Sequence, residues 1–176
     1  MNVFIMPNLD KKNCYDTVVS VSKFFYSHSV CVLMSEFYEA KFSGLVGVVF
    51  DDEETCAEKC DIIIAVGGDG TILSASNLAC LCNKRLLGIN CGRLGFMANL
   101  EYNELELLNN LLNGNFSTEK RMMLHDAVHQ DVLILEYLEN GKYREAQTYF
   151  EKRIAATKKK SKNRYTGIEV LNLMLN

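Results

Sequence analysis

An α/β fold built on a parallel β-sheet is predicted by two features of the sequence. Short apolar runs alternate with helix-type patterns from residue 1 to residue 114, as expected for strands joined by right-handed helical crossovers. The run Ile62–Val66 is entirely apolar, rich in isoleucine and followed at once by glycine. Such a run is typical of a strand that is buried on both faces of a parallel sheet.

The elements of this fold are expected in a regular order. Pro7, the only proline, ends the first strand. The acidic stretch Asp51–Glu54 is interpreted as a solvated loop, with the start of a helix as the alternative. Asn113–Gly114 is expected to cap the last helix of this part. The expected strands are Val3–Met6, Val30–Met34, Leu45–Phe50, Ile62–Val66 and Leu86–Asn90, and the expected helices are Asp16–Tyr26, Glu36–Phe42, Thr71–Cys82 and Leu100–Leu112.

Residues 126–176 differ in character from the α/β domain that we assign to residues 1–125. Two helices, Ala127–Leu138 and Tyr143–Ile154, are expected in this atypical tail, followed by the short apolar end Ile168–Leu175. The helices are expected to cover the exposed sheet or to pair with another chain, as in a homo-oligomer. His125 and His129 would share one helix face, but without a third ligand they predict no metal site.

Composition and charge exclude several classes of protein. The 176 residues are 48% hydrophobic and 23% charged, which excludes global disorder. The net charge of −3 gives no reason to expect nucleic acid or an anionic membrane as a partner. No run approaches the roughly 18 apolar residues that span a bilayer, and no basic segment precedes the first apolar run. We therefore expect a cytoplasmic protein whose seven cysteines are reduced thiols without zinc-binding spacing.

The stretch Asp61–Thr71, DIIIAVGGDGT, has the order that a nucleotide-phosphate site needs: a strand, a glycine turn with one carboxylate, and a helix start. Glycines let phosphate oxygens approach backbone N–H groups, and the helix directs its positive end to the same place. Asp69 could orient a hydroxyl, accept its proton or hold Mg²⁺. The alternative is that Asp69 only caps the helix and the glycines only make the turn.

Two familiar phosphate loops are excluded by spacing. The stretch lacks the lysine of a P-loop, and the third glycine of the dinucleotide-binding fingerprint would fall at Leu73. The glycine turn is therefore a different kind of phosphate loop.

A second glycine turn narrows the family that the sequence resembles. GGDGT at Gly67–Thr71, followed by LGINCGRLGF at Leu87–Phe96, closely resembles the NAD kinases. The first motif is shared with diacylglycerol and sphingosine kinases and, in a related form, with phosphofructokinases, so the second motif decides between them. Arg121–Leu124 also resembles the segment with which NAD kinases leave their N-terminal domain. The resemblance implies a three-layer parallel-sheet nucleotide-binding domain of the NAD kinase and phosphofructokinase type.

The resemblance implies phosphoryl transfer from ATP, or from polyphosphate, to the 2′-hydroxyl of the adenosine ribose of NAD, giving NADP with Mg²⁺ as cofactor. Asp69 is similar to the family's catalytic aspartate, which activates that hydroxyl. Asn90 would shape the second turn and Phe96 would pack near the adenine, with a strand-end hydrogen bond and a core aromatic as their alternatives. The residues that the resemblance assigns to nucleotide binding are Gly67, Gly68, Asp69, Gly70, Thr71, Asn90, Gly92 and Phe96.

The sequence departs from the family after Leu124. NAD kinases continue into a β-rich C-terminal domain with an Asn-Glu or Asn-Asp pair for the NAD ribose, and no such pair can be placed in the tail. The alternative function is therefore a catalytically inactive or truncated NAD-kinase-like module that binds nucleotides or a partner.

Overall fold

Strands and helices alternate along the chain in the computed structural model, which describes residues 1–92, 97–124 and 165–173. The strands of the described residues are β1 (Asn2–Pro7), β2 (Cys31–Ser35), β3 (Val48–Asp51), β4 (Ile62–Gly67), β5 (Arg85–Asn90), β6 (Leu100–Glu101), β7 (Phe116–Leu124) and β8 (Tyr165–Leu173). Their helices are α1 (Cys14–Ser27), η1 (Glu36–Tyr38), α2 (Glu39–Phe42), α3 (Glu53–Lys59), α4 (Asp69–Leu81), η2 (Leu105–Leu107) and α5 (Leu108–Leu112).

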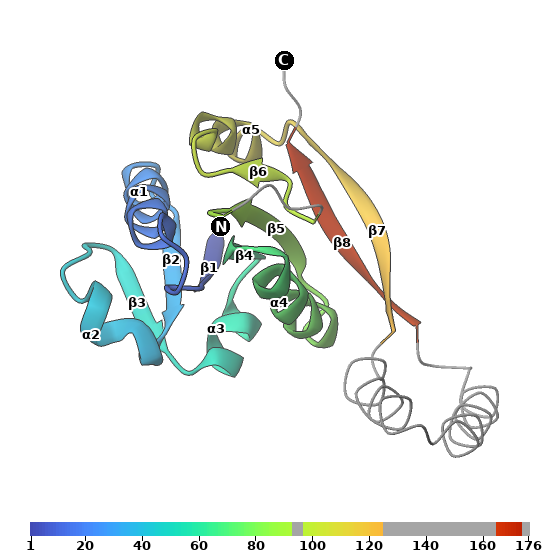
Figure 1. Ribbon diagram of the computed structural model, residues 1–176, viewed down its shortest axis with the longest axis horizontal. Coiled ribbons are helices and arrows are strands. Elements are labelled where there is room, and N and C mark those ends of the chain that lie inside the picture. The colour runs from blue at the N-terminus through green and yellow to red at the C-terminus, as the bar shows by residue number, and fades with distance from the viewer. Residues whose placement is uncertain (93–96, 125–164, 174–176) are drawn as a thin grey trace, which may run out of the picture. The chain divides into compact units, whose positions relative to one another are not determined.

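The strands of the described residues form one sheet in the order β3-β2-β1-β4-β5-β8-β7, with β6 paired to β5 (Figure 1). The pairs β2–β3, β1–β2, β1–β4, β4–β5, β5–β6 and β5–β8 are parallel. The strand order reverses at β1, which has β2 on one side and β4 on the other. The predicted parallel α/β sheet is confirmed.

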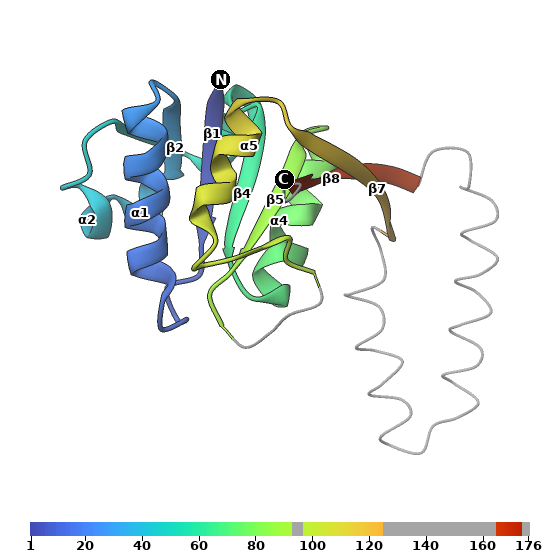
Figure 2. The ribbon, with the colours of Figure 1, turned by 90° about the horizontal axis from the view of Figure 1, so that it is seen from above.

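Helices cover both faces of the sheet and so make three layers. The helices α1 and α5 lie on one face, and α3 and α4 lie on the other (Figures 1 and 2). All six residues of β4 are buried, because this central strand is covered on both sides. One continuous core joins the inner side of α1 to the sheet, through Val18, Val21, Phe25, Val3, Ile5, Ile64 and Val66.

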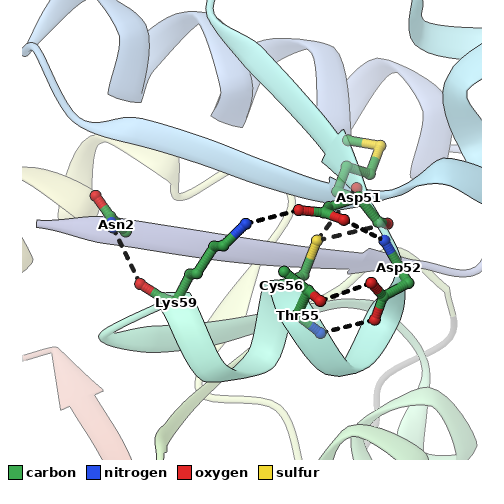
Figure 3. Close-up of polar contacts among 7 residues, drawn as sticks. Asn2, Asp51, Asp52, Thr55, Cys56 and Lys59 are labelled. Carbon is green, nitrogen blue, oxygen red and sulfur yellow. Dashed lines mark hydrogen bonds and ion pairs between the residues drawn. The ribbon is translucent and has the colours of Figure 1, made fainter.

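The interpretation of Asp51–Glu54 as a solvated loop is wrong, because Asp52 caps a helix there. Its Oδ1 accepts a hydrogen bond of 2.8 Å from the backbone N–H of Thr55, and its Oδ2 accepts one of 2.6 Å from the Thr55 hydroxyl (Figure 3). Asp51 forms an ion pair of 2.7 Å with Lys59 at the other end of α3. The acidic residues therefore begin α3, as the alternative interpretation held.

The predicted helix Leu100–Leu112 is only partly correct. Its first two residues form β6 and pair with Ile89 and Asn90 of β5, and helical turns begin at Leu105. Gly114 has a φ of +72°, a left-handed conformation that ends a helix at little cost when the residue is glycine. The predicted helix end is therefore confirmed, and the predicted beginning is wrong.

The sequence pattern did not predict the last two strands of the described residues, β7 and β8. β7 follows Gly114, and β8 contains most of the apolar end Ile168–Leu175 and pairs with β5 at Leu86 and Val170. The chain divides into two compact units, one of residues 1–121 and 168–176 and one of residues 122–167. The predicted helices Ala127–Leu138 and Tyr143–Ile154, with His125 and His129, lie outside the described residues. No helix in the described part of the chain is long and apolar enough to cross a membrane.

Candidate active site

The two glycine turns lie next to each other, because the strands that precede them are neighbours. Parallel strands end at one edge of the sheet, and Gly67 at the end of β4 is in register with Asn90 at the end of β5. The backbone N–H of Cys91 donates a hydrogen bond of 2.8 Å to the carbonyl oxygen of Gly67. The fold therefore brings together two motifs that lie more than 15 residues apart in sequence.

Asp69 lies in the first turn of α4, directly after the first glycine turn. Gly68 occupies the N-cap position, and its carbonyl oxygen accepts hydrogen bonds from the N–H groups of Thr71 and Ile72 at 2.9 and 3.1 Å. Asp69 therefore does not cap α4. Instead, its Oδ1 accepts a hydrogen bond of 3.2 Å from the backbone N–H of Met97, which follows the second glycine turn. One carboxylate thus connects the two motifs.

The glycines of the first turn have different physical roles. A Cβ atom on Gly67 would lie 2.3 Å from Oγ1 of Thr71, so only glycine fits there without displacing that side chain. A Cβ atom on Gly70 would meet no atom within 4 Å. Packing therefore requires Gly67, whereas Gly70 opens onto unfilled space.

The second glycine turn is held by Asn90, whose side chain is only 1% exposed. Its Oδ1 accepts a hydrogen bond of 3.1 Å from the backbone N–H of Gly92, and its Nδ2 donates to both carboxylate oxygens of Glu101 at 3.1 and 3.0 Å. The backbone N–H of Glu101 in turn donates to the carboxylate of Glu104 at 3.0 Å. Phe96 lies outside the described residues.

Two thiols lie beside the second turn. Cys14, at the start of α1, and Cys91 are both buried, and the Cys14 thiol is 3.2 Å from the carbonyl oxygen of Val66. A hydrogen bond with Cys14 lowers the pKa of the Cys91 thiol to about 7, and the same contact together with burial raises the pKa of Cys14. Cys14 is therefore the thiol of the pair that keeps its proton more strongly.

Lys11 passes close to both glycine turns, although it comes from the loop that follows β1. A Cβ atom on Gly68 would lie 3.6 Å from its Cε, and one on Gly92 would lie 3.9 Å from its Cδ. The first turn has no lysine of its own, so this distant segment supplies a cation beside it. No local motif marks Lys11, Asn8 or Glu101, because each reaches the two turns only through a contact with a remote segment, as Asn8 does through a hydrogen bond to Thr71.

A cavity of about 720 Å³ opens beside the first turn. It lies at the carboxyl ends of β1 and β4, where the strand order reverses, which is the usual ligand site of an open α/β sheet. Its size is typical of a small-molecule site. The lining residues come from the end of β1 and the loop after it, from Ser35, from η1 and α2, from Glu53 at the start of α3, and from Gly70, Thr71 and Ser74 of α4.

Comparison with known proteins identifies the family. Residues 3–116, more than half of the chain, match the family described as the ATP-NAD kinase N-terminal domain. The chain belongs to the NAD kinase family. It is 33% identical to the NAD kinase of Natranaerobius thermophilus over 133 residues, which cover 74% of this chain and 45% of that protein. It is 35% identical to the NAD kinase of Moorella thermoacetica over 127 residues, which cover 72% of this chain and 40% of that protein.

A solved structure confirms the fold expected of a NAD kinase. The crystal structure of yeast NADH kinase complexed with NADH superposes with a TM-score of 0.59 and 17% sequence identity, covering 69% of this chain and 40% of that chain. This likeness concerns the fold. The chain spans less than half the length of the curated NAD kinases described above.

Proposed function

We propose that this chain phosphorylates NAD, with ATP as the phosphoryl donor, Mg²⁺ as the cofactor and NADP as the product. Two relatives that align with this chain are named NAD kinase, and this name supports NAD as the substrate. The glycine turns at the carboxyl ends of β4 and β5 support phosphate binding. In this proposal the nucleotide-binding residues are Gly67, Gly68, Asp69, Gly70, Thr71, Asn90, Gly92 and Phe96.

The observation that carries the proposal is the hydrogen bond between Asp69 Oδ1 and the backbone N–H of Met97. This bond fixes the Asp69 carboxylate, which belongs to the first glycine turn, against the segment that follows the second turn. A general base needs such a fixed position to reach the proton that it removes.

In the proposed reaction, the 2′-hydroxyl oxygen of the adenosine ribose attacks the terminal phosphorus of ATP. The bond from that phosphorus to its bridging oxygen breaks, ADP leaves, and Asp69 accepts the hydroxyl proton. Lys11 and the positive end of α4 stabilise charge on the transferred phosphoryl group.

The residues of the first turn fit a Mg²⁺ ion that enters with ATP. Magnesium sites in kinases use one or two carboxylates together with substrate phosphates, and Asp69 offers oxygen ligands of this type in the turn. Among the described residues, no three His, Cys, Asp or Glu side chains cluster closely enough to hold a metal ion by themselves. When bound, Mg²⁺ neutralises charge on the donor phosphates.

The test is NADP formation by the purified 176-residue chain with NAD, ATP and Mg²⁺, and with NADH in a parallel assay. Asp69→Asn should lower the rate by about 10²-fold or more, because it removes the base. Asp16→Asn is a matched control, since Asp16 is an exposed carboxylate in the first turn of α1, and its rate should equal that of the wild type. A wild-type chain that forms no product, or an Asp69→Asn variant with an unchanged rate, would contradict the proposal.

A further inference from the structure

Cys14 and Cys91 are two thiols that the proposed phosphoryl transfer does not use. Both are buried, with exposed fractions of 0% and 1%, and both belong to the core between α1 and the sheet. The Cys14 thiol donates a hydrogen bond of 3.2 Å to the carbonyl oxygen of Val66, and the backbone N–H of Cys91 donates one of 2.8 Å to the carbonyl oxygen of Gly67. The two cysteines therefore meet at the end of β4.

The side chain of Cys91 lies on the face of the sheet that α1 covers. Successive side chains of a strand alternate between its two faces, and Leu87, Ile89 and Cys91 share one core with the inner side of α1. Cys14 is the first residue of α1. The two thiols contact each other there through a hydrogen bond. A pair of sulfur atoms thus connects the start of α1 to the second glycine turn.

This contact makes the two thiols chemically unequal. The hydrogen bond with Cys14, together with one from Thr17, lowers the pKa of Cys91 to about 7, although burial and the charge of Glu101 act in the opposite direction. The same contact with Cys91 and burial raise the pKa of Cys14. The thiolate is the form of cysteine that reacts with oxidants. Cys91 is therefore the attacking sulfur at neutral pH, and Cys14 is a neighbour that keeps its proton.

The thiol of Cys91 lies just beneath the surface of the second glycine turn. The next residue, Gly92, is exposed. A Cβ atom on Gly92 would meet only side-chain atoms of Asn90 and Lys11, at 3.8 and 3.9 Å, so little packs over the turn at this position. Hydrogen peroxide is close to water in size, and a small displacement of the turn therefore admits it to the thiolate.

We propose that Cys14 and Cys91 are a redox-active pair, which forms a reversible disulfide when hydrogen peroxide reaches the second glycine turn. The Cys91 thiolate attacks one peroxide oxygen and the O–O bond breaks, which leaves a sulfenic acid on Cys91 and releases hydroxide. The proton that Cys91 gave up neutralises this hydroxide. The sulfur of Cys14 then displaces the hydroxyl group from Cys91, which leaves as water with the Cys14 proton. Two thiols and one peroxide thus give one disulfide and two water molecules.

The disulfide joins the segment that follows β1 to the second glycine turn. The backbone N–H of Cys14 donates a hydrogen bond of 3.1 Å to the carbonyl oxygen of Lys11, and Cys91 stands between Asn90 and Gly92. A disulfide bond is only ~2 Å long, shorter than a hydrogen bond between two sulfur atoms, so its formation draws α1 and the turn together. Transient disulfides of this kind serve redox sensing in reducing compartments.

The test is peptide mapping of the reduced 176-residue chain after reaction with an equimolar amount of hydrogen peroxide. The remaining thiols are blocked with N-ethylmaleimide, and the digest is analysed by mass spectrometry without reduction. The chain should lose two of its seven thiols, the peptides of Cys14 and Cys91 should be joined, and dithiothreitol should separate them. No joined peptide, or a disulfide between other cysteines in its place, would overturn the proposal.

Two variants separate the steps of the reaction. Cys14→Ser keeps a hydroxyl donor beside Cys91 but cannot form the disulfide, so Cys91 should accumulate as a sulfenic acid that dimedone labels. Cys91→Ser should give neither the joined peptide nor a dimedone label on Cys14. Circular dichroism verifies the fold of each variant. Equal dimedone labelling of the remaining thiol in the two variants would contradict the assignment of Cys91 as the attacking sulfur, and with it the proposal.

Cys82→Ser is the control. Cys82 lies directly after α4 and is only partly buried, whereas Cys14 and Cys91 are buried. This variant should form the joined peptide to the same extent as the wild type. If exposure alone decided which thiols react, Cys82 would be oxidised before Cys91, and that result would also overturn the proposal.

The outcome for the disulfide can be separated from that for the proposed function, because peptide mapping requires no catalytic activity. A joined peptide in a chain that forms no NADP would contradict only the proposed function. NADP formation by a chain that gives no joined peptide would contradict only the redox pair.

Discussion

Asn8 and Thr71 are joined by a hydrogen bond of 3.1 Å from Nδ2 of Asn8 to Oγ1 of Thr71. The backbone N–H of Asn8 also donates to the carbonyl oxygen of Val66 at 2.9 Å. The loop after β1 therefore holds the first glycine turn from both sides, once before Gly67 and once after Gly70. These two hydrogen bonds fix the turn to the loop that follows β1.

Thr71→Val should destabilise the protein by about 1 kcal/mol, because it removes the acceptor for Asn8 and keeps the side-chain shape. For a chain of this size, that loss lowers the melting temperature by roughly 2–4 °C. Thr71→Ser keeps the hydroxyl and should retain most of the stability. Thermal denaturation followed by circular dichroism measures both, and equal losses in the two variants would show that the hydrogen bond is not the cause.

Gly67→Ala and Gly70→Ala should have opposite effects on stability. The first places a methyl group 2.3 Å from Oγ1 of Thr71 and should cost roughly 1–3 kcal/mol through displacement of packed atoms. The second meets no atom within 4 Å and lies in a helix, so it should leave stability unchanged or raise it by up to ~1 kcal/mol. Urea denaturation of both variants tests this contrast. Similar losses at the two positions would contradict the packing argument.

Asn90→Asp should destabilise the protein at pH 7 by roughly 2 kcal/mol, because the new carboxylate would face the Glu101 carboxylate that now accepts two hydrogen bonds. Stability should recover as the pH falls below about 5, where one of the two carboxyl groups gains a proton. The double variant with Glu101→Gln should recover at pH 7, since an amide again faces a carboxylate. Denaturation of the single and double variants from about pH 4 to pH 8 measures the effect, and a pH-independent loss would refute it.

The free energy of unfolding should fall as the pH rises from 9 to 11. Burial raises the pKa of the Cys56 and Cys60 thiols from 9.0 to about 11. Between pH 9 and 11 the unfolded chain loses thiol protons that the folded chain keeps. The contribution of these thiols to the free energy of unfolding is therefore complete below pH 9 and is lost as the pH rises through 11. The slope is about 1.4 kcal/mol per pH unit for each thiol at most.

Cys56→Ala should reduce this slope, since it removes one of the buried thiols whose pKa is raised. The Cys56 thiol lies against the carbonyl oxygens of Met34 and Asp51 (Figure 3). Ser76→Ala, at a buried hydroxyl that does not titrate in this range, should keep the wild-type slope. Urea denaturation between pH 8 and 11 compares the three proteins, and equal slopes for Cys56→Ala and the wild type would exclude Cys56 as a source.

The central strands and the glycine turns could be predicted because their signals are local. An apolar run that ends in Gly67 and Gly68 contains the strand, the turn and the helix start in about ten residues. At Asp51–Glu54 the sequence favours a solvated loop over a helix start, because four acidic residues in a row suit both, and only the contact between Asp52 and Thr55 distinguishes the two.

The remaining differences arise from contacts between distant segments. Leu100 and Glu101 continue a leucine-rich helical pattern, but pairing with β5 makes them a strand. Nothing near Val170 indicates that its partner is Leu86. In the site, the motif predicted Asp69, whereas Lys11 and Glu101 reach the two turns only after the chain has folded.

One edge of β5 is completed by two separate segments. β6, about ten residues later in the chain, pairs with Ile89 and Asn90, and β8 pairs with Leu86. At a synthesis rate of ~5–20 residues per second, the part of this edge at Leu86 therefore waits on the order of ten seconds for its partner strand β8 after β5 has left the ribosome. Open strand edges recruit other strands. Until β8 has been synthesised, the sheet that carries both glycine turns can therefore pair at the β5 edge with a neighbouring molecule.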